Sequence, residues 1–301
     1  MKQAHPRQSL SRMCWLFGVT RQAYYKHHKA SAITSNKDSV VLQLVDEIRA
    51  LHPVMGGRKM YSLLKQQLEA QDIKMGRDGF FNLLCENNLL LRRRKRKIVT
   101  TWSRHSFRKY PHLVKDFIPE GPNQLWVSDI TYWKTENEIL YLSLITDAYS
   151  RKIVGYDLSD NLASVNAQRA LTMAITSATT PLAGLIHHSD RGIQYCTHEY
   201  IELLSKHRIL ISMTEHSDPL ENAIAERING IIKQEYLLQH AVKNKQEALK
   251  LLQQTVNTYN QHRPHLSCNM QTPDEIHQHQ LQPKRLWKNY YRKKNNTFVN
   301  S

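Results

Sequence analysis

Residues 187–236 contain the sequences HHSDRGIQY at 187–195 and NAIAERINGIIK at 222–233, and the rest of the chain is interpreted from these two pieces. The second piece predicts a helix. At about 100° per residue, Glu226 and Lys233 share one face of that helix. The opposite, buried face carries three isoleucines: Ile224, Ile228 and Ile231. The first piece predicts a short strand that ends at Asp190. A carboxylate at a strand end and one on a helix face can meet at one metal site.

Asp190 and Glu226 also have ordinary explanations. An Asp shortly before Gly is commonly a turn residue, and a Glu on a helix face is commonly solvated. A third carboxylate, Asp129, lies upstream in WVSDIT at 126–131, and 35 residues separate Asp190 from Glu226.

This order and spacing of acids resemble the retroviral-integrase and transposase superfamily. Four motifs narrow the resemblance: WVSDIT, HHSDRGIQY, ENAIAERINGIIKQE at 221–235 and YNQHRPH at 259–265. Together they resemble the second-frame (OrfB) transposases of the third family of bacterial insertion sequences, over most of the chain. The resemblance implies a DDE transposase whose α/β catalytic core is ribonuclease-H-like, with an all-α helix-turn-helix module in front.

The charge is distributed unevenly along the chain. The formal net charge is +16; residues 1–120 hold 23 Lys and Arg against 9 Asp and Glu, whereas residues 121–301 hold 19 against 17. A basic first part before a near-neutral domain favours a polyanion as partner. DNA is the expected polyanion. An anionic membrane is the alternative, but no long amphipathic anchor is present.

Several other classes of protein are disfavoured. The sequence has no apolar run near twenty residues and no signal peptide, and its four cysteines form no close pair. We therefore expect a cytoplasmic, nucleoid-associated protein without a disulfide framework or a cysteine-based zinc site. No Gly-Lys-Ser/Thr loop for phosphate is present, so ATP hydrolysis is not indicated.

The pattern along the chain predicts five regions. Residues 1–35 form a helix-turn-helix-like segment with two short helices over 9–28, although a plain packing hairpin fits these helices equally well. Residues 36–91 form a helical DNA-binding module with helices over 38–51, 58–70 and 77–87. Residues 92–120 are a basic linker. Residues 121–240 are the catalytic core, and residues 241–301 are a helical and basic tail.

Within the core, strand-like and helical segments alternate in a recognisable order. Three strands precede a helix, and a strand, a helix, a strand and the helix of Glu226 follow; the first three are joined by short turns, which indicates an antiparallel meander. This order matches a ribonuclease-H-like fold with a mixed five-stranded sheet. It places Asp129 on the first strand and Asp190 after the fourth.

We predict that Asp129, Asp190 and Glu226 bind Mg²⁺ or Mn²⁺, with two ions expected, because three converging carboxylates need cations and hard oxygen ligands suit these metals. Three other acids compete for the role: Asp147, the strongest rival, Asp157 and Asp218. By resemblance, Lys233 is expected to contact DNA phosphate. Asn222 and His188 are expected to support the site. The basic run Arg92, Arg93, Arg94, Lys95, Arg96 and Lys97 is expected to lie on phosphates, although such runs are commonly just solvated linkers.

The predicted reaction is hydrolysis at an insertion-sequence end, followed by attack of the freed 3′-hydroxyl on another DNA. The expected partners are the terminal repeats, the target DNA, further copies of the chain on DNA and a first-frame (OrfA) product that is joined to this chain. The alternative function is a DNA-binding regulator that retains an inactive integrase fold.

Overall fold

The computed structural model describes residues 8–91, 108–215 and 222–279. Its contacts divide the chain into two compact units. The first comprises Met1–Leu51 and Met55–Arg92, and the second comprises His52–Val54 and Arg93–Ser301. Across the described residues, no helix combines the length and the apolar character needed to cross a membrane. The basic run at 92–97, Asp218 and the tail beyond residue 279 lie outside the described residues.

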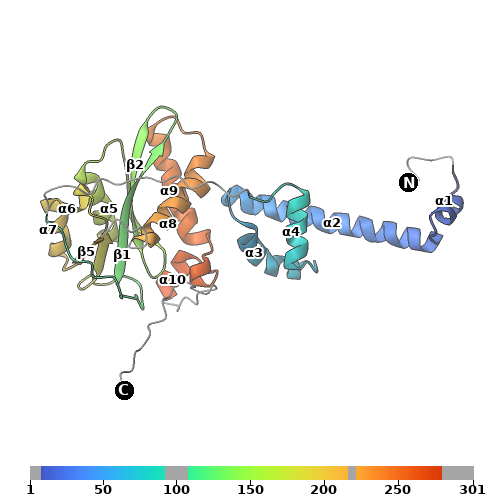
Figure 1. Cartoon of the computed structure of the whole chain (residues 1–301), viewed down its shortest axis with the longest axis horizontal. Helices are drawn as coiled ribbons and strands as arrows, with labels where there is room; N and C mark the ends of the chain where they lie inside the picture. Colours follow the sequence, from blue (N-terminus) through green and yellow to red (C-terminus); the bar gives the residue numbers. More distant parts are fainter. Residues whose placement is uncertain (1–7, 92–107, 216–221, 280–301) are drawn as a thin grey trace, which may run out of the picture. The chain divides into compact units, whose positions relative to one another are not determined.

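The described part of the first unit is all α-helical (Figure 1). Its helices are α1 (Leu10–Leu16), α2 (Arg21–Leu51), α3 (Gly57–Ala70) and α4 (Arg77–Glu86). The turn after α1 follows from its residues: Gly18 takes a positive φ of 65°, and the Thr20 hydroxyl accepts a hydrogen bond from the backbone N–H of Ala23 at 3.0 Å. Helices α2 to α4 share an apolar core around Val45, Leu64 and Phe80.

The long helix α2 differs from the sequence-based expectation. Two helices were predicted over this stretch, one ending near residue 28 and the other starting at residue 38, but α2 runs without a break from Arg21 to Leu51. The residues between 28 and 38 include neither Gly nor Pro. Without one of these residues, nothing in the backbone forces the helix to end.

The described part of the second unit is built on one mixed sheet. Its strands are β1 (Leu125–Lys134), β2 (Ile139–Asp147), β3 (Ile153–Ser159), β4 (Ile186–Ser189) and β5 (Leu210–Met213). Their order is β3-β2-β1-β4-β5. The pairs β1–β2 and β2–β3 are antiparallel, whereas β4 pairs parallel with both β1 and β5. The ribonuclease-H-like fold with a five-stranded mixed sheet is thus confirmed.

Helices cover both faces of this sheet (Figure 1). One face packs against α5 (Ser164–Ser177), α6 (Ile193–Cys196) and α7 (His198–Lys206). The other packs against α8 (Ala223–Ile231), a π-helical turn η1 (Ile232–Tyr236), a 3-10 turn η2 (Leu237–Gln239) and α9 (Lys245–His262). A second 3-10 turn, η3 (Leu266–Cys268), and α10 (Pro273–His279) follow. The short helices α6 and α10 were not predicted.

Close packing of α5 on β3 depends on one glycine. A Cβ atom at Gly155 would lie 2.1 Å from the backbone oxygen of Ala170 and 2.9 Å from the Cβ of Ala174. Any larger residue would therefore push α5 away from the sheet.

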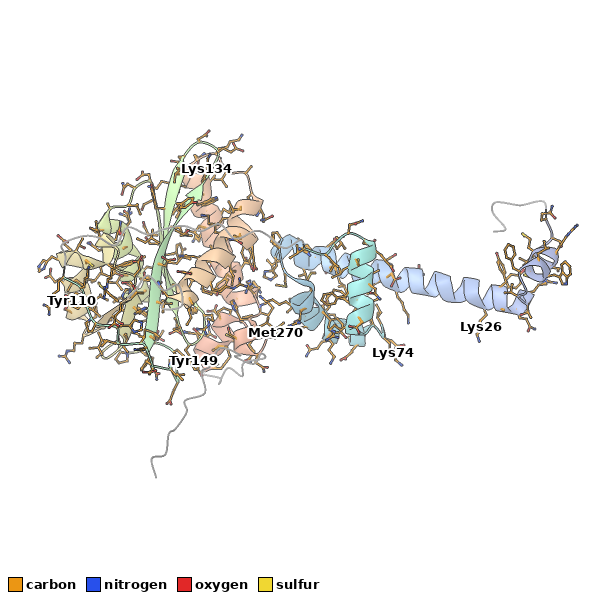
Figure 2. The ribbon with its side chains drawn as sticks, in the orientation of Figure 1. Lys26, Lys74, Tyr110, Lys134, Tyr149 and Met270 are labelled. Atoms are coloured by element: carbon orange, nitrogen blue, oxygen red, sulfur yellow. The ribbon has the colours of Figure 1, made fainter. Side chains whose placement is uncertain are left out.

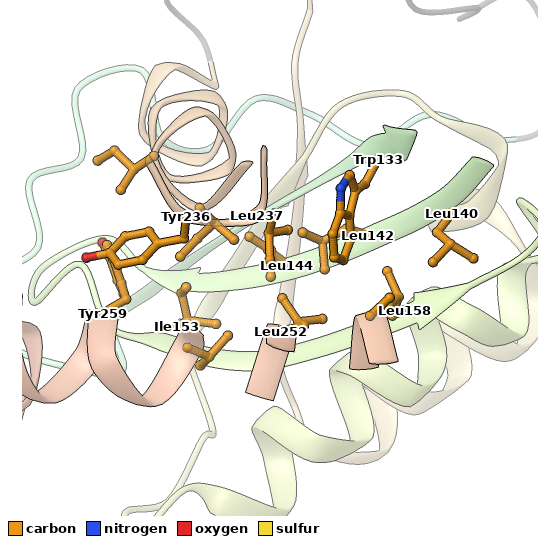
Figure 3. Close-up of a cluster of buried hydrophobic side chains, with 14 of the residues drawn as sticks. Trp133, Leu140, Leu142, Leu144, Ile153, Leu158, Tyr236, Leu237, Leu252 and Tyr259 are labelled. Atoms are coloured by element: carbon orange, nitrogen blue, oxygen red, sulfur yellow. The ribbon is translucent and has the colours of Figure 1, made fainter. Parts of the chain in front are cut away.

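The apolar layer beneath α8 and α9 holds the carboxylate-bearing helix in place (Figure 3). Tyr236 enters this layer from the end of the π-helical turn η1, Leu237 enters it from η2, and Leu252 enters it from α9. They pack with Leu142 and Leu144 of β2, which are buried. The helix that carries Glu226 is therefore fixed against the middle of the sheet.

Candidate active site

Asp129 lies on the face of β1 that is turned toward α8. Side chains alternate along a strand, and two neighbours on the same face, Val127 and Trp133, belong to buried apolar clusters that also contain residues of α8, Ala225 in one and Ile228 in the other. The side chain of Asn229, also on α8, donates a hydrogen bond from Nδ2 to Asp129 Oδ2 at 2.7 Å.

Asp190 follows β4 directly and comes beside Asp129 through strand register. Parallel pairing matches Val127 with His188, so two further residues along each chain bring Asp129 and Asp190 to the same level of the sheet. Asp190 Oδ1 accepts a hydrogen bond from the backbone N–H of Gly192 at 2.9 Å. A Cβ at Gly192 would lie only 2.9 Å from that same oxygen, so glycine is required for this carboxylate orientation.

Glu226 sits on the exposed side of α8. The opposite side is buried through Ile228 and Ile231, as predicted from the helical periodicity. The pKa of Glu226 is raised by partial burial and by the negative charge of Asp190. The two carboxylates therefore interact, although they come from different elements.

The electrostatics of Asp129 show that all three acids share one neighbourhood. Burial and the charges of Asp190 and Glu226 raise the pKa of Asp129 from its ordinary value of 3.8 to about 7, against the opposing hydrogen bonds from Asn229 and from the backbone of Ile130. A carboxylate cluster with this mutual repulsion is stabilised by a cation.

The donor set fits a hard divalent cation. Carboxylate oxygens are the ligands that Mg²⁺ and Mn²⁺ prefer. Two amide oxygens, Asn222 Oδ1 and Asn229 Oδ1, are also buried and have no hydrogen-bond partner among the residues that the structure describes, so they are available to water bound at the site. Within residues 8–91, 108–215 and 222–279, no three acidic, histidine or cysteine side chains already stand in the close arrangement of ion ligands.

The two residues expected to support the site have clear structural contacts. Asn222 is buried and donates from Nδ2 to the backbone oxygen of Ser128 at 3.0 Å, which ties the start of α8 to β1. His188 is fully buried; its Nδ1 lies 2.9 Å from Ser212 Oγ on β5, and its ring packs edge-on against His112. His188 therefore joins β4 to β5.

Lys233 does not lie on a continuous α-helix with Glu226, contrary to the prediction. The α-helix ends at Ile231, and Lys233 belongs to the π-helical turn η1. Its Nζ lies 3.8 Å from the centroid of the Tyr132 ring. Burial lowers the pKa of Lys233.

The strongest rival carboxylate has a structural role. Asp147 is completely buried, and both of its oxygens accept hydrogen bonds: Oδ1 from the N–H and hydroxyl of Ser150, and Oδ2 from the backbone N–H of Asn123. Asp147 pairs with Trp126 at one end of the β1–β2 ladder, and Lys134 lies at the other end. Figure 2 labels Tyr149, two residues after Asp147, and Lys134 at these two ends.

Asp157, the second rival, is likewise engaged in a structural contact. Its two oxygens accept hydrogen bonds from the Arg169 guanidinium at 2.8 and 3.1 Å. Both rivals therefore stabilise turns and helix packing.

Two further contacts near the site had not been predicted. The first is the hydrogen bond from Asn229 to Asp129. Asn229 lies three residues after Glu226, which is the spacing of a shared helix face, but a single sequence offers no reason to select it. Arg263, in the YNQHRPH motif, is 1% exposed and binds both carboxylate oxygens of Glu235 at 2.8–3.0 Å. This ion pair secures the π-helical turn that carries Lys233.

Comparison with known proteins identifies an integrase core domain in this chain. A family profile described as an integrase core domain matches residues 119–219, and a second profile of the same description matches residues 207–273. A catalytic core domain of the HTLV-2 integrase, solved with magnesium, is 23% identical over 52% of this chain and 97% of that chain, with a TM-score of 0.42.

The sequence relatives are insertion-sequence proteins. An uncharacterized 31 kDa protein of insertion element IS600 from Shigella sonnei is 34% identical over 84% of this chain and 93% of its own length. The transposase of IS629 from the same species is 30% identical over 83% and 85%. Transposase InsF of IS3A from Escherichia coli is 32% identical over 54% and 57%.

These matches define the class first: the chain has an integrase core and is a DDE transposase/integrase. Within that class, it belongs to the IS3-type family of insertion-sequence transposases, and the predicted resemblance is confirmed.

Proposed function

We propose that this transposase cleaves a phosphodiester at the ends of its insertion sequence and joins the freed 3′-hydroxyl to target DNA, with Asp129, Asp190 and Glu226 as metal ligands. One observation carries the proposal: the charges of Asp190 and Glu226 both raise the pKa of Asp129. Three elements, a strand, a strand end and a helix, thus supply carboxylates that repel one another, and a bound cation would relieve this repulsion.

Different groups of the protein have different roles in this reaction. Bound Mg²⁺ or Mn²⁺, expected as a pair of ions, supplies activation of the attacking oxygen and stabilisation of the leaving oxygen. Asn229 holds the Asp129 carboxylate in one orientation through its 2.7 Å hydrogen bond. Gly192 does the same for Asp190 through its backbone N–H. Lys233 offers its ammonium to a DNA phosphate, and the basic run at 92–97 supplies further phosphate contacts.

The proposed partners follow from this reaction. They are element-end and target DNA, further copies of the chain on that DNA and a first-frame product joined to it, all in the cytoplasm at the nucleoid. In this arrangement, the upstream product adds selectivity for the element ends, because phosphate contacts alone carry no sequence information.

The test is cleavage of a labelled element-end duplex by the purified chain in Mg²⁺, with strand breaks mapped. Asp129→Asn, Asp190→Asn and Glu226→Gln should each abolish cleavage and keep DNA binding. Glu202→Gln is the matched control, because Glu202 is also exposed on a helix, α7, with a side chain that is 71% accessible. An intact wild-type chain that binds the duplex but never nicks it would instead indicate an inactive regulator.

A further inference from the structure

Lys233 is held in an unusual way for a lysine at a nucleic-acid site. Its ammonium lies 3.8 Å from the centroid of the Tyr132 ring, well inside the roughly 6 Å limit for a cation–π contact. An aromatic face attracts an ammonium without cancelling its charge, whereas a carboxylate partner would neutralise it. The ring thus orients the cation and leaves it able to bind an anion.

The backbone on both sides of the contact is fixed. Tyr132 lies on β1, directly across from Tyr141 of β2. On the side of Lys233, Ile232 and Tyr236 of the same π-helical turn are buried. Glu235 is bound by Arg263. A π-helical turn in a helix is often associated with a functional site, and here it carries the lysine.

The position of the Lys233–Tyr132 contact relative to the three carboxylates also allows both to bind the same DNA molecule. Tyr132 is three residues beyond Asp129 on β1, which corresponds to roughly 10 Å along the strand, and this odd spacing places the two side chains on opposite faces of the sheet. β4 pairs with β1 only at Leu125–Val127, so no described strand covers the β4-facing edge of β1 at Tyr132. Tyr132 as a whole residue is 42% exposed. Lys233 reaches the Tyr132 ring from the turn that follows α8. A DNA strand that passes from the carboxylates over this edge of β1 can therefore place a neighbouring phosphate at the Lys233 ammonium.

We propose that Tyr132 is a positioning residue: its ring holds the Lys233 ammonium at the edge of the sheet for contact with a phosphate of DNA bound at the carboxylates. This inference rests on the proposed DNA contact of Lys233 and adds the residue that orients it.

The first experiment measures binding of an element-end duplex by the full chain in Ca²⁺, which occupies oxygen sites. Lys233→Met should weaken binding about tenfold. Tyr132→Leu should weaken it about two- to fivefold, because the ring contact is lost. Tyr132→Phe, the matched control, keeps the ring and should bind within twofold of wild type. In the double variant Tyr132→Leu/Lys233→Met, the loss should equal that of Lys233→Met alone.

Two outcomes of this binding experiment would overturn the inference. Losses that simply add in the double variant would show that Tyr132 acts independently of Lys233. Unchanged binding by Lys233→Met would remove the proposed phosphate contact itself. Thermal unfolding of each variant confirms that the chain is folded, and the partial exposure of Tyr132 favours this.

The second experiment tests the positioning without DNA. Acylation of individual lysines by a limiting amine reagent is followed by mass spectrometry, with the exposed Lys250 of α9 as internal reference. Tyr132→Leu should raise the acylation rate of Lys233 several-fold, and Tyr132→Phe should leave it unchanged. An unchanged rate in Tyr132→Leu would show that the ring does not hold the lysine, whatever the binding result. Because this readout does not involve DNA, it separates failure of the positioning from failure of the phosphate contact.

Discussion

Replacing Asp129 by asparagine should inactivate the transposase and at the same time stabilise its metal-free fold. In the folded protein, burial and the charges of Asp190 and Glu226 raise the pKa of Asp129 from 3.8 to about 7. One pKa unit corresponds to about 1.4 kcal/mol. Above pH 7, the ionised carboxylate therefore lowers the free energy of unfolding by at most about 4 kcal/mol. Because the Asp129 side chain is only partly shielded from solvent, we expect about half of this destabilisation, roughly 2 kcal/mol.

The sign of the pH dependence follows from the raised pKa. Between about pH 4 and pH 7 the folded state holds a proton that the unfolded state has lost, so rising pH removes stability from the wild type. The amide of the Asp129→Asn variant cannot ionise, and it can still accept the hydrogen bond from Asn229. The advantage of the variant should therefore be largest at pH 8 and should disappear near pH 4.

Thermal unfolding in EDTA measures this effect. For a unit of this size, about 2 kcal/mol corresponds to an increase of roughly 4–8 °C in the Tm of the variant at pH 8. Mg²⁺ should raise the Tm of the wild type more than that of the variant, because a ligand stabilises the state that binds it. A variant that is less stable than wild type in EDTA at pH 8, or whose advantage is the same at pH 5, would refute the reasoning about the carboxylate cluster.

Three further predictions concern the site and the DNA contacts. Gly192→Ala should displace the Asp190 carboxylate, since a Cβ would lie 2.9 Å from Oδ1; we expect cleavage to fall at least tenfold with nearly unchanged DNA binding, and full activity would contradict this role. Asn229→Ala removes a hydrogen bond that lowers the pKa of Asp129, so the rising limb of the pH–rate profile should move to higher pH, and an unmoved limb would speak against the contact. Neutral residues at 92–97 should weaken binding to all DNA sequences about equally and lower the salt slope by about 0.9 per lost phosphate contact, whereas loss for one sequence alone would mean that the run reads bases.

Local patterns in the sequence were sufficient for the strands and for most of the helices, although they missed the unbroken α2 and the short helices α6 and α10. The strand-like stretch that contains WVSDIT predicted the first strand of the core, and the structure places Asp129 on β1. The isoleucine spacing predicted the helix face that α8 buries, with Glu226 on the other side. Such patterns are readable because the strand period of two and the helix period of 3.6 depend on neighbours only a few residues apart. The 35-residue spacing between Asp190 and Glu226 and the four motifs indicated the family.

Which side chains contact one another follows only from the tertiary structure. The Asn229–Asp129 hydrogen bond spans 100 residues, and the buried Arg263–Glu235 pair joins two helical segments. Only the packed fold shows that both oxygens of Asp147 are already engaged, which separates a turn-forming acid from a site acid. The change from α- to π-helix at Ile232, which sets Lys233 over Tyr132, likewise has no local signature in the sequence. These features depend on long-range packing, which chain order alone does not encode in any short pattern.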